Sequence, residues 1–274
     1  MSDRIQIEIK DGVADVRLTR PEKMNALDRA MFVALCETGK NLAREPGLRA
    51  VVLSGEGRGF CAGLDFMSFQ KTKASADESD AETDAPHGLL DLYGTKVTTF
   101  AQYAAWVWQQ LPVPVIAAIH GVAFGGGLQI ALAADIRFAT PDAKLSVMEI
   151  KWGLVPDMTG TQTLRNLVRL DVAKELTYTG RIVLGTEAHA LGLVTRLAED
   201  PREAAFGLAR EIAGRSPSAV RASKRLLDAS RAGSVDDGLL REAEIQRTVI
   251  GGPNQVEAVM ANIEKRPPQF HDPS

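Results

Sequence analysis

The chain has 274 residues, of which 45% are hydrophobic and 24% charged, the balance of an ordinary folded globular protein. Its 32 basic and 35 acidic residues leave a formal charge of -3, which argues against a general nucleic-acid-binding surface and against a polybasic membrane anchor. Two cysteines are too few for a disulfide framework or a zinc site, and no apolar run approaches the roughly 20 residues that span a bilayer. The first ten residues do not resemble a signal peptide, so we expect a protein of a reducing, cytoplasmic compartment.

The first 60 residues alternate short predicted strands with one helix. Apolar and polar residues alternate over 5–9 and, less cleanly, over 13–18, and Asp11-Gly12 predicts a hairpin turn between these two strands. Asp28 is placed to cap the following helix. Residues 50–55 then predict a buried strand that ends in a glycine turn.

The middle of the chain continues this alternation after one interruption. Residues 113–119 predict an apolar strand, which leads into three glycines and a helix of small residues over 128–134. Strands that alternate with helices predict an α/β layered fold. The interruption is residues 70–87, which hold five acids and almost nothing apolar, so we expect a mobile acidic insertion. It is either a surface loop or a lid over a pocket.

From about residue 200 onward the pattern predicts only helices. Capping residues or a first-turn proline mark four helix starts, at Asp200, Ser216, Ser234 and Pro253. Short helices rarely stand alone, so we expect these to pack on the core or on another subunit.

Two glycine-rich turns, at residues 59–65 and 124–129, follow predicted strands. Glycine lets the backbone come close to a ligand, and the second turn opens into a helix whose unpaired N–H groups favour negative charge. Two such N–H groups aimed at one point make an oxyanion hole, in which each donor contributes about 3 kcal/mol to a developing oxyanion. The alternative is that these glycines serve tight packing alone. The turn is not a dinucleotide fingerprint, because the spaced glycines are missing.

Glu149 is the first candidate acid or base. It stands among apolar residues of the segment 147–152, where desolvation would raise its pKa toward the range useful for proton transfer. Asp157 follows eight residues later. The alternative is that Glu149 is a surface acid on a half-exposed strand.

In combination, these motifs resemble the crotonase (enoyl-CoA hydratase/isomerase) superfamily. The resemblance covers about residues 3 to 265, and the matching segments are 20–27, 59–65, 120–127, 149–160, 178–181 and 187–194. Jointly these motifs are specific for that fold. They are much less specific for one reaction, because the superfamily hosts hydration, double-bond migration, dehalogenation, decarboxylation and thioester hydrolysis.

The resemblance implies an α/β fold, with a crotonase spiral of ββα units over residues 1–199 that carries the CoA and active sites. Residues 200–274 would then form a helical oligomerisation region of a homotrimer or a dimer of trimers (hexamer). The implied substrate is an acyl-CoA thioester of fatty-acid or related lipid metabolism. Beyond the coenzyme A of that substrate, no cofactor, metal, nucleic acid or membrane is implied.

The resemblance also implies a set of site residues. The backbone N–H groups of Leu64 and Gly126 would form the oxyanion hole for the thioester carbonyl. The residues that would shape the CoA groove or hold the second turn are Lys23, Met24, Ala26, Ala62, Asp65, Phe66, Gly125 and Gly127. The chemistry is consistent with this, because a held carbonyl stabilises an enolate and a nearby carboxylate then moves the proton.

The chain departs from the hydratase pattern at one position. Typical hydratases of the superfamily carry one glutamate after the glycines and a second on a later strand. Glu149 matches the second, whereas the first falls on Gln129, which cannot act as a base but can orient a water molecule. Dienoyl-CoA isomerases of the superfamily have acids at the positions of Gln129, Glu149 and Asp157, so this chain matches two of the three.

We therefore expect an enoyl-CoA hydratase/isomerase, a lyase or isomerase, with Glu149 and Asp157 as its acid/base pair and Gln129 beside them. The open alternatives are a dienoyl-CoA isomerase specifically, a catalytically weak acyl-CoA-binding homologue, and a CoA thioesterase or decarboxylase. His120 and Cys61 are expected to be structural, because neither has an evident catalytic partner.

Overall fold

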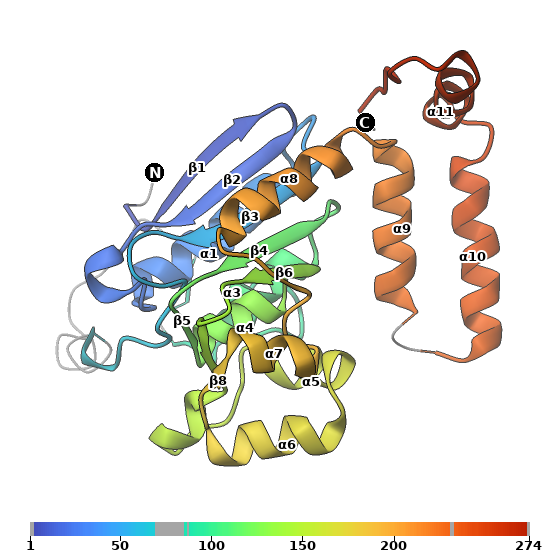
Figure 1. Ribbon diagram of the computed structural model, residues 1–274. Coiled ribbons are helices and arrows are strands. Elements are labelled where there is room, and N and C mark those ends of the chain that lie inside the picture. The colour runs from blue at the N-terminus through green and yellow to red at the C-terminus, as the bar shows by residue number, and fades with distance from the viewer. Residues whose placement is uncertain (1–2, 69–84, 87, 231–232, 273–274) are drawn as a thin grey trace.

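The computed structural model describes residues 3–68, 85–86, 88–230 and 233–272 (Figure 1). Nearly all of the predicted acidic insertion, residues 70–84 and 87, lies outside the described residues. Where it is described, the chain forms two sheets, helices on both faces of the larger sheet, and a helical arm at the C-terminal end.

The larger sheet has six strands in the order β1-β2-β3-β4-β6-β9. They are β1 (Ile5–Lys10), β2 (Val13–Leu18), β3 (Ala50–Gly55), β4 (Val115–Ile119), β6 (Ile136–Ala139) and β9 (Arg196–Leu197). β1 and β2 form an antiparallel hairpin, and the other neighbours pair in parallel. The hairpin turn is the predicted one: Asp11 and Gly12 have φ values of 51° and 77°, the left-handed conformation that a two-residue turn of this kind requires.

A smaller sheet of three strands runs in the order β5-β7-β8. Its strands are β5 (Val122–Phe124), β7 (Lys144–Ser146) and β8 (Val183–Leu184). In the middle of the chain a pass goes from the larger sheet to the smaller one and then into a helix, as in β4, β5 and α4 (Gly126–Leu132). After β3 the chain makes the same pass through a parallel bridge between Cys61 and Ala123. This is the spiral of ββα units that was expected.

The strands of the larger sheet bury both of their faces, which is why they contain so few polar residues. Successive residues of β3 and β4 alternate between two cores. Leu53 and Ala117 belong to the core under α1 (Arg29–Leu42) and α3 (Phe100–Gln109). Val52 and Ile116 belong to the core under α8 (Pro201–Ala213), which crosses the opposite face (Figure 1).

Helices α1 and α8 begin where their capping residues predicted. Asp28 accepts a hydrogen bond from the Met31 N–H at 2.8 Å, and Asp200 accepts one from the Glu203 N–H at 2.9 Å. The other elements are η1 (Pro21–Lys23), η2 (Met148–Trp152), α5 (Gly160–Leu167), α6 (Leu170–Thr179), α7 (Gly185–Leu191), α9 (Pro217–Ala229), α10 (Val235–Val249) and α11 (Pro253–Glu264), with η denoting a 3₁₀ helix. None of the helices in the described ranges is both long and apolar enough to cross a membrane.

Helices α9, α10 and α11 form an arm that stands clear of the sheet layers (Figure 1). Side chains of α9 join this arm to the body: Lys224 lies 2.5 Å from Asp135, which precedes β6, and Arg221 donates to the Leu48 carbonyl at 3.1 Å. Helix α8 is different, because its alanines pack on the sheet. Of the four helices predicted after residue 200, the first therefore belongs to the layered body and the last three make the arm.

Candidate active site

The two predicted glycine turns lie against each other. The Cys61 N–H donates to the Val122 carbonyl at 3.0 Å, and the Phe124 N–H donates to the Cys61 carbonyl at the same distance. A Cβ atom on Gly127 would lie 2.7 Å from both Cβ and Sγ of Cys61, so only glycine permits this approach. The glycines do serve tight packing, as the alternative held, and that packing brings the two turns into register.

The backbone N–H groups of Leu64 and Gly126 both lack a hydrogen-bond acceptor among the described residues. Leu27 makes both hydrogen bonds of its bridge with Leu64, since its N–H donates to Gly63 and its carbonyl accepts from Asp65. Gly126 begins α4, where the first N–H groups have no acceptor within the helix. Neither N–H donates to any acceptor in the part of the chain that the structure describes.

These two N–H groups belong to closely adjacent backbone. A Cβ atom on Gly63, the residue before Leu64, would lie 3.7 Å from the Gly126 nitrogen. Gly63 has φ of 86°, which a side chain would strain. Two unpartnered donors from separate turns therefore lie near one another, which is the arrangement that an oxyanion hole needs.

Glu149 lies beside this pair. It sits in η2, not on the strand expected, and only 8% of the residue is exposed, so the surface-acid alternative is wrong. A Cβ atom on Gly125, the residue before Gly126, would lie 3.3 Å from Glu149 Oε1. Oε1 also accepts a hydrogen bond from Gln129 Nε2 at 2.6 Å. Oε2 is buried and has no hydrogen-bond partner among the described residues.

Burial changes the acidity of both predicted acids. Desolvation raises the pKa of Glu149, the backbone N–H of Glu149 and then the hydrogen bond from Gln129 partly offset this, and the nearby charge of Asp157 raises it further. Desolvation also raises the pKa of Asp157, although its side chain is exposed in the single chain. Two nearby carboxyl groups that both hold protons more tightly than usual are typical of proton-transfer sites.

Gln129 forms hydrogen bonds both with Glu149 and with the turn that follows Asp157. It is 2% exposed and comes from α4. Its Oε1 accepts hydrogen bonds from the N–H groups of Met158 and Gly160, both at 2.8 Å. Met158 follows Asp157 directly, so Gln129 joins the Glu149 carboxyl to the turn that carries Asp157.

The residues predicted to shape a CoA groove lie in the segment 23–26 and in the turn that follows Cys61. Lys23 is exposed at the end of η1, and Ala26 is buried. Met24 has a left-handed φ of 48°, and its carbonyl accepts the Ala62 N–H at 2.9 Å. The two segments are therefore held side by side, and their part in binding CoA stays a prediction.

Asp65 is committed to a buried ion pair. One of its oxygens lies 2.9 Å from Arg20 Nη2, and another accepts the Ser68 N–H at 3.1 Å. Burial opposes ionisation, but these hydrogen bonds outweigh it and lower the pKa of Asp65. Because Arg20 also donates to the Ala26 carbonyl at 3.0 Å, Asp65 ties the first predicted turn to the start of the groove segment.

Several residues at the site were not singled out from the sequence. Asn25 is fully buried, and its Nδ2 donates to the Glu56 and Gly59 carbonyls, both at 2.9 Å, which fixes the start of the first turn. Its left-handed φ of 55° is the only signal, and that becomes visible only in the structure. Met158 packs against Gly126, since a Cβ atom there would lie 2.7 Å from its Sδ.

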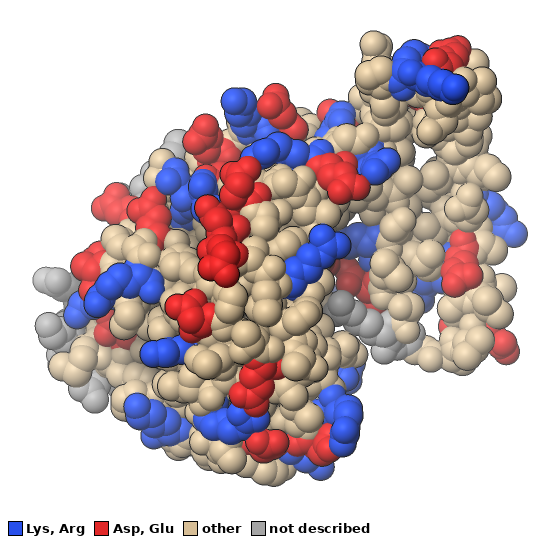
Figure 2. Space-filling view, in the orientation of Figure 1, with Lys and Arg blue, Asp and Glu red and all other residues tan. Residues whose placement is uncertain are grey.

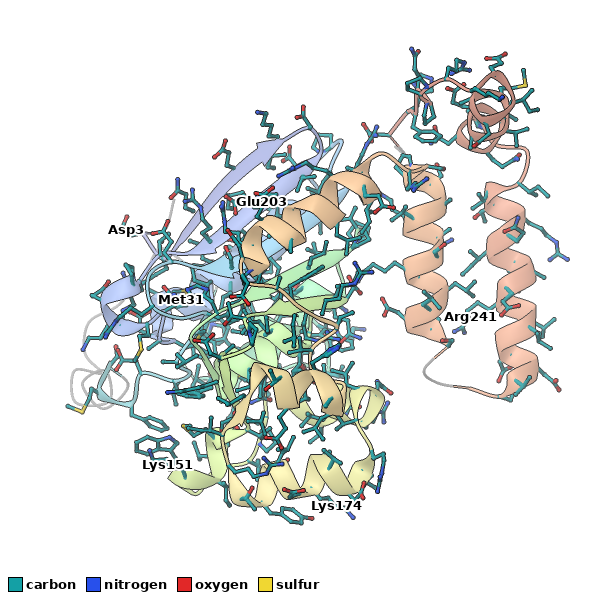
Figure 3. The ribbon with its side chains drawn as sticks, in the orientation of Figure 1. Asp3, Met31, Lys151, Lys174, Glu203 and Arg241 are labelled. Atoms are coloured by element: carbon teal, nitrogen blue, oxygen red, sulfur yellow. The ribbon has the colours of Figure 1, made fainter. Side chains whose placement is uncertain are left out.

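An aromatic pair stands at the exposed end of η2. The rings of Phe66 and Trp152 lie 4.4 Å apart between centroids, and Trp152 is 53% exposed. Lys151, which Figure 3 labels at this end of the molecule, places its Nζ 5.5 Å from the Trp152 centroid. Phe66 was predicted as a groove residue, whereas Trp152 was noted only as an apolar neighbour of Glu149.

The residues expected to be structural have structural partners. The buried Cys61 thiol donates to the Asn25 carbonyl at 3.0 Å, and burial raises its pKa to about 12, which removes it as a nucleophile at neutral pH. The His120 ring lies 2.9 Å from the Gly57 carbonyl. Within the described ranges, no group of three or more His, Cys, Asp or Glu residues could hold a metal ion.

Comparison with known proteins gives one consistent result. The family model described as enoyl-CoA hydratase/isomerase matches residues 8–273. The chain is 36% identical over 258 residues to the mitochondrial Delta(3,5)-Delta(2,4)-dienoyl-CoA isomerase of Mus musculus, covering 93% of this chain and 77% of that one. It is 31% identical over 266 residues to the mitochondrial methylglutaconyl-CoA hydratase of Homo sapiens, covering 94% and 74%.

Solved structures agree with the sequence relatives. The enoyl-CoA hydratase from Bacillus anthracis has a TM-score of 0.84 at 30% identity and covers 97% of this chain and 98% of that one. The enoyl-CoA hydratase from Mycobacterium tuberculosis H37Rv has a TM-score of 0.83 at 29% identity and covers 98% and 99%.

Proposed function

Because the chain belongs to the enoyl-CoA hydratase/isomerase family, the crotonase superfamily, and is an enzyme of that kind, we propose that it converts acyl-CoA thioesters through an enolate. One observation carries the proposal. A buried carboxyl with an unpartnered oxygen, Glu149 Oε2, lies next to the turn that presents the open N–H group of Gly126, with that of Leu64 close by.

The first step is binding of the thioester carbonyl. Its oxygen accepts hydrogen bonds from the N–H groups of Leu64 and Gly126. When a proton leaves the carbon next to the thioester, negative charge develops on that oxygen. Each donor then stabilises the transition state by about 3 kcal/mol, because the donors are already in place and need no reorganisation.

The proton itself is moved by the carboxyl groups. Glu149 Oε2 takes the proton, because it is the carboxyl oxygen without a hydrogen-bond partner among the described residues. Asp157 delivers a proton to another carbon of the acyl chain, which shifts the double bond. The raised pKa values of both groups bring them closer to neutral pH, where an acid/base catalyst is most effective.

We favour double-bond migration in a dienoyl-CoA over hydration. Two-acid addition of water needs a second carboxylate, and Gln129 has none to offer. The similarity to a dienoyl-CoA isomerase supports this choice. Hydration is the second candidate, supported by the similarity to methylglutaconyl-CoA hydratase. An acyl-CoA-binding homologue of weak activity is the third, because Gln129 replaces a hydratase glutamate.

The remaining expectations extend this proposal. Lys23, Met24, Ala26, Ala62 and Phe66 line the CoA groove, and the coenzyme A of the substrate is the only cofactor involved. The arm of α9, α10 and α11 joins copies of the chain into a trimer or a dimer of trimers.

Product analysis over a panel of 2-enoyl-CoA and 3,5-dienoyl-CoA esters tests the proposal. In H₂O, isomerisation leaves the mass of the ester unchanged, whereas hydration adds the mass of one water. In D₂O, isomerisation introduces deuterium into the acyl chain. We expect an isomerised 3,5-dienoyl-CoA product. Asp157→Asn should lower that activity at least about 100-fold, the usual scale for an acid/base group, and leave any hydration intact.

The matched control is Asp142→Asn, which changes an exposed acid outside the site. Equal isomerisation by the Asp157 variant and the wild type would exclude the acid/base pair. If calorimetry shows micromolar binding of acyl-CoA and no ester gives product over hours, the chain is an acyl-CoA-binding homologue and the proposed enzymatic reaction is wrong.

A further inference from the structure

Gln129 makes three buried hydrogen bonds, and together they fix the direction of its amide. Two backbone N–H groups, those of Met158 and Gly160, point at one end of the amide from 2.8 Å. An N–H donor must face an oxygen, so that end is Oε1. The other end is therefore Nε2, and it donates to Glu149 Oε1 at 2.6 Å.

This arrangement leaves Oε1 of Gln129 fully occupied. A carbonyl oxygen has two lone pairs, and each already accepts one N–H group. Gln129 therefore has no acceptor with which to hold an attacking water, the role that its position in the sequence suggested. Instead, Gln129 donates one hydrogen bond to Glu149 Oε1. The other carboxyl oxygen, Oε2, has no hydrogen-bond partner among the described residues.

The same amide fixes the turn that follows Asp157. Thr159 has a left-handed φ of 69°, which is unusual for a β-branched residue, and its Oγ1 is buried without a partner among the described residues. Such a turn needs support from outside itself. Gln129 Oε1 gives that support on both sides of Thr159, and a Cβ atom on Gly160 would lie only 2.6 Å from it.

We propose that Gln129 is a positioning residue that orients the Glu149 carboxyl through Nε2 and sets its spacing from Asp157 through Oε1. The inference rests on the proposed function, in which Glu149 and Asp157 move the proton. A glutamine suits this position because one neutral side chain can donate to a carboxylate and accept from two N–H groups. A glutamate here would set two carboxylates against each other.

Two variants separate the two ends of the amide. Gln129→Glu is isosteric and keeps an oxygen for the N–H groups of Met158 and Gly160, but an ionised carboxylate cannot donate to Glu149. Gln129→Met has a similar length and makes neither kind of hydrogen bond. Both lose the donor that favours ionised Glu149, so in both the acid limb of kcat/KM moves to higher pH.

We expect the ratio of kcat/KM at about pH 8 to that at about pH 5 to rise roughly tenfold or more in both variants, because each pKa unit is a factor of ten. Gln162→Glu is the control, since Gln162 is exposed and lies outside the machinery. Its profile should match the wild type. Near pH 4, where the introduced carboxyl is neutral and still accepts from the turn, Gln129→Glu should also retain the wild-type melting temperature better than Gln129→Met.

A titration that needs no turnover accompanies the kinetics. The side-chain carboxyl of Glu149 is followed by NMR in protein labelled with ¹³C-glutamate, and its signal is assigned with Glu149→Gln. Its apparent pKa should rise in both Gln129 variants. An unchanged titration and acid limb, with only a uniform loss of kcat, would reduce Gln129 to packing and overturn the inference. If the wild type converts no ester, the proposed function fails, yet the titration still decides what Gln129 does.

Discussion

The carboxyl of Glu149 is held in an energetically unfavourable environment. Burial disfavours its charged form, and Oε2 lacks the hydrogen bond that most buried polar atoms find. Natural proteins keep such groups mainly where they have a task, because an apolar or amide side chain would be more stable there. The free-energy cost of burying the Glu149 carboxyl is therefore an argument for its role in proton transfer.

Glu149→Gln should lower turnover and raise stability together. The rate falls at least about 100-fold, because an amide cannot accept the proton. The folded pKa of Glu149 lies above its ordinary value of 4.5, so its contribution to stability is full below that value and is lost as the pH rises through the folded pKa. The amide is neutral throughout, and its oxygen still accepts from Gln129 Nε2.

Chemical denaturation near pH 4 and near pH 7 measures this effect. We expect the variant to unfold at higher denaturant than the wild type near pH 7, and the advantage to shrink near pH 4, where both side chains are neutral. A variant that is less stable than the wild type near pH 7 would mean that burial of the charge costs nothing, and the argument for a raised pKa would fail.

At the residue scale, the sequence identified what lies within motifs and missed what depends on contacts between them. Glu149 was chosen from its apolar sequence neighbours, and Leu64 and Gly126 from the resemblance of the two glycine turns to a known family. The direction of the Gln129 amide was not, because it is set by N–H groups about 30 residues away in the chain. The same holds for Asn25, because its carbonyl partners, Glu56 and Gly59, follow α1 and β3 in the sequence.

At the scale of elements, the site depends on how closely the turn before α4 approaches the turn after β3. Gly127→Ala should push them apart, because the new Cβ would overlap the Cβ and Sγ of Cys61. Overpacking of this kind costs about 1–3 kcal/mol. The shift would also separate the N–H groups of Leu64 and Gly126, so kcat/KM should fall with stability.

The control is Gly207→Ala. Gly207 lies in α8, is exposed, and has nothing within 4 Å of the position that a Cβ would take. Alanine there should raise stability by up to about 1 kcal/mol, because a helical glycine loses more backbone entropy on folding. Urea midpoints and kcat/KM of both variants test the contrast. Two variants with the same midpoint would show that the approach of the two turns is not tight.

The elements that the sequence predicted well are those with local signals. The Asp11-Gly12 hairpin, the Asp28 cap and the helix starts near Asp200 and Ser234 each depend on residues a few positions apart. The segment of Glu149 was placed on a strand, both in the surface-acid alternative and by the resemblance to hydratases. It forms the 3₁₀ helix η2, since the chain must turn there from β7 toward α5.

At the scale of the whole molecule, the single chain leaves a helical arm with little to hold it. Helix α10 buries no residue, and its main partner in the chain is α9. Arg241, labelled in Figure 3 between the two helices, donates to the Ala229 carbonyl at 3.3 Å. Large exposed apolar side chains on the arm are Leu227, Val235, Leu239, Leu240, Ile250, Val256, Val259, Met260 and Ile263.

The arm combines charged side chains with exposed apolar surface. Figure 2 shows acidic and basic side chains over the body and along the arm, with uncharged surface between them on the arm. An apolar surface of this extent is rare on a monomer and usually marks contact with another protein chain. The sequence predicted that these four helices pack on the core or on another subunit, because short helices rarely stand alone, and only the structure shows that α8 belongs to the body.

Leu240→Glu tests whether the arm joins copies of this chain. Leu240 is 65% exposed on α10, so the substitution harms nothing within one chain but places a charge in the proposed subunit contact. Sedimentation should show a trimer or hexamer for the wild type and smaller species for the variant. Val97→Glu is the control, because Val97 is 83% exposed on the body and should leave the assembly unchanged. A monomeric wild type, or identical sedimentation of all three proteins, would mean that something other than a second copy covers α10.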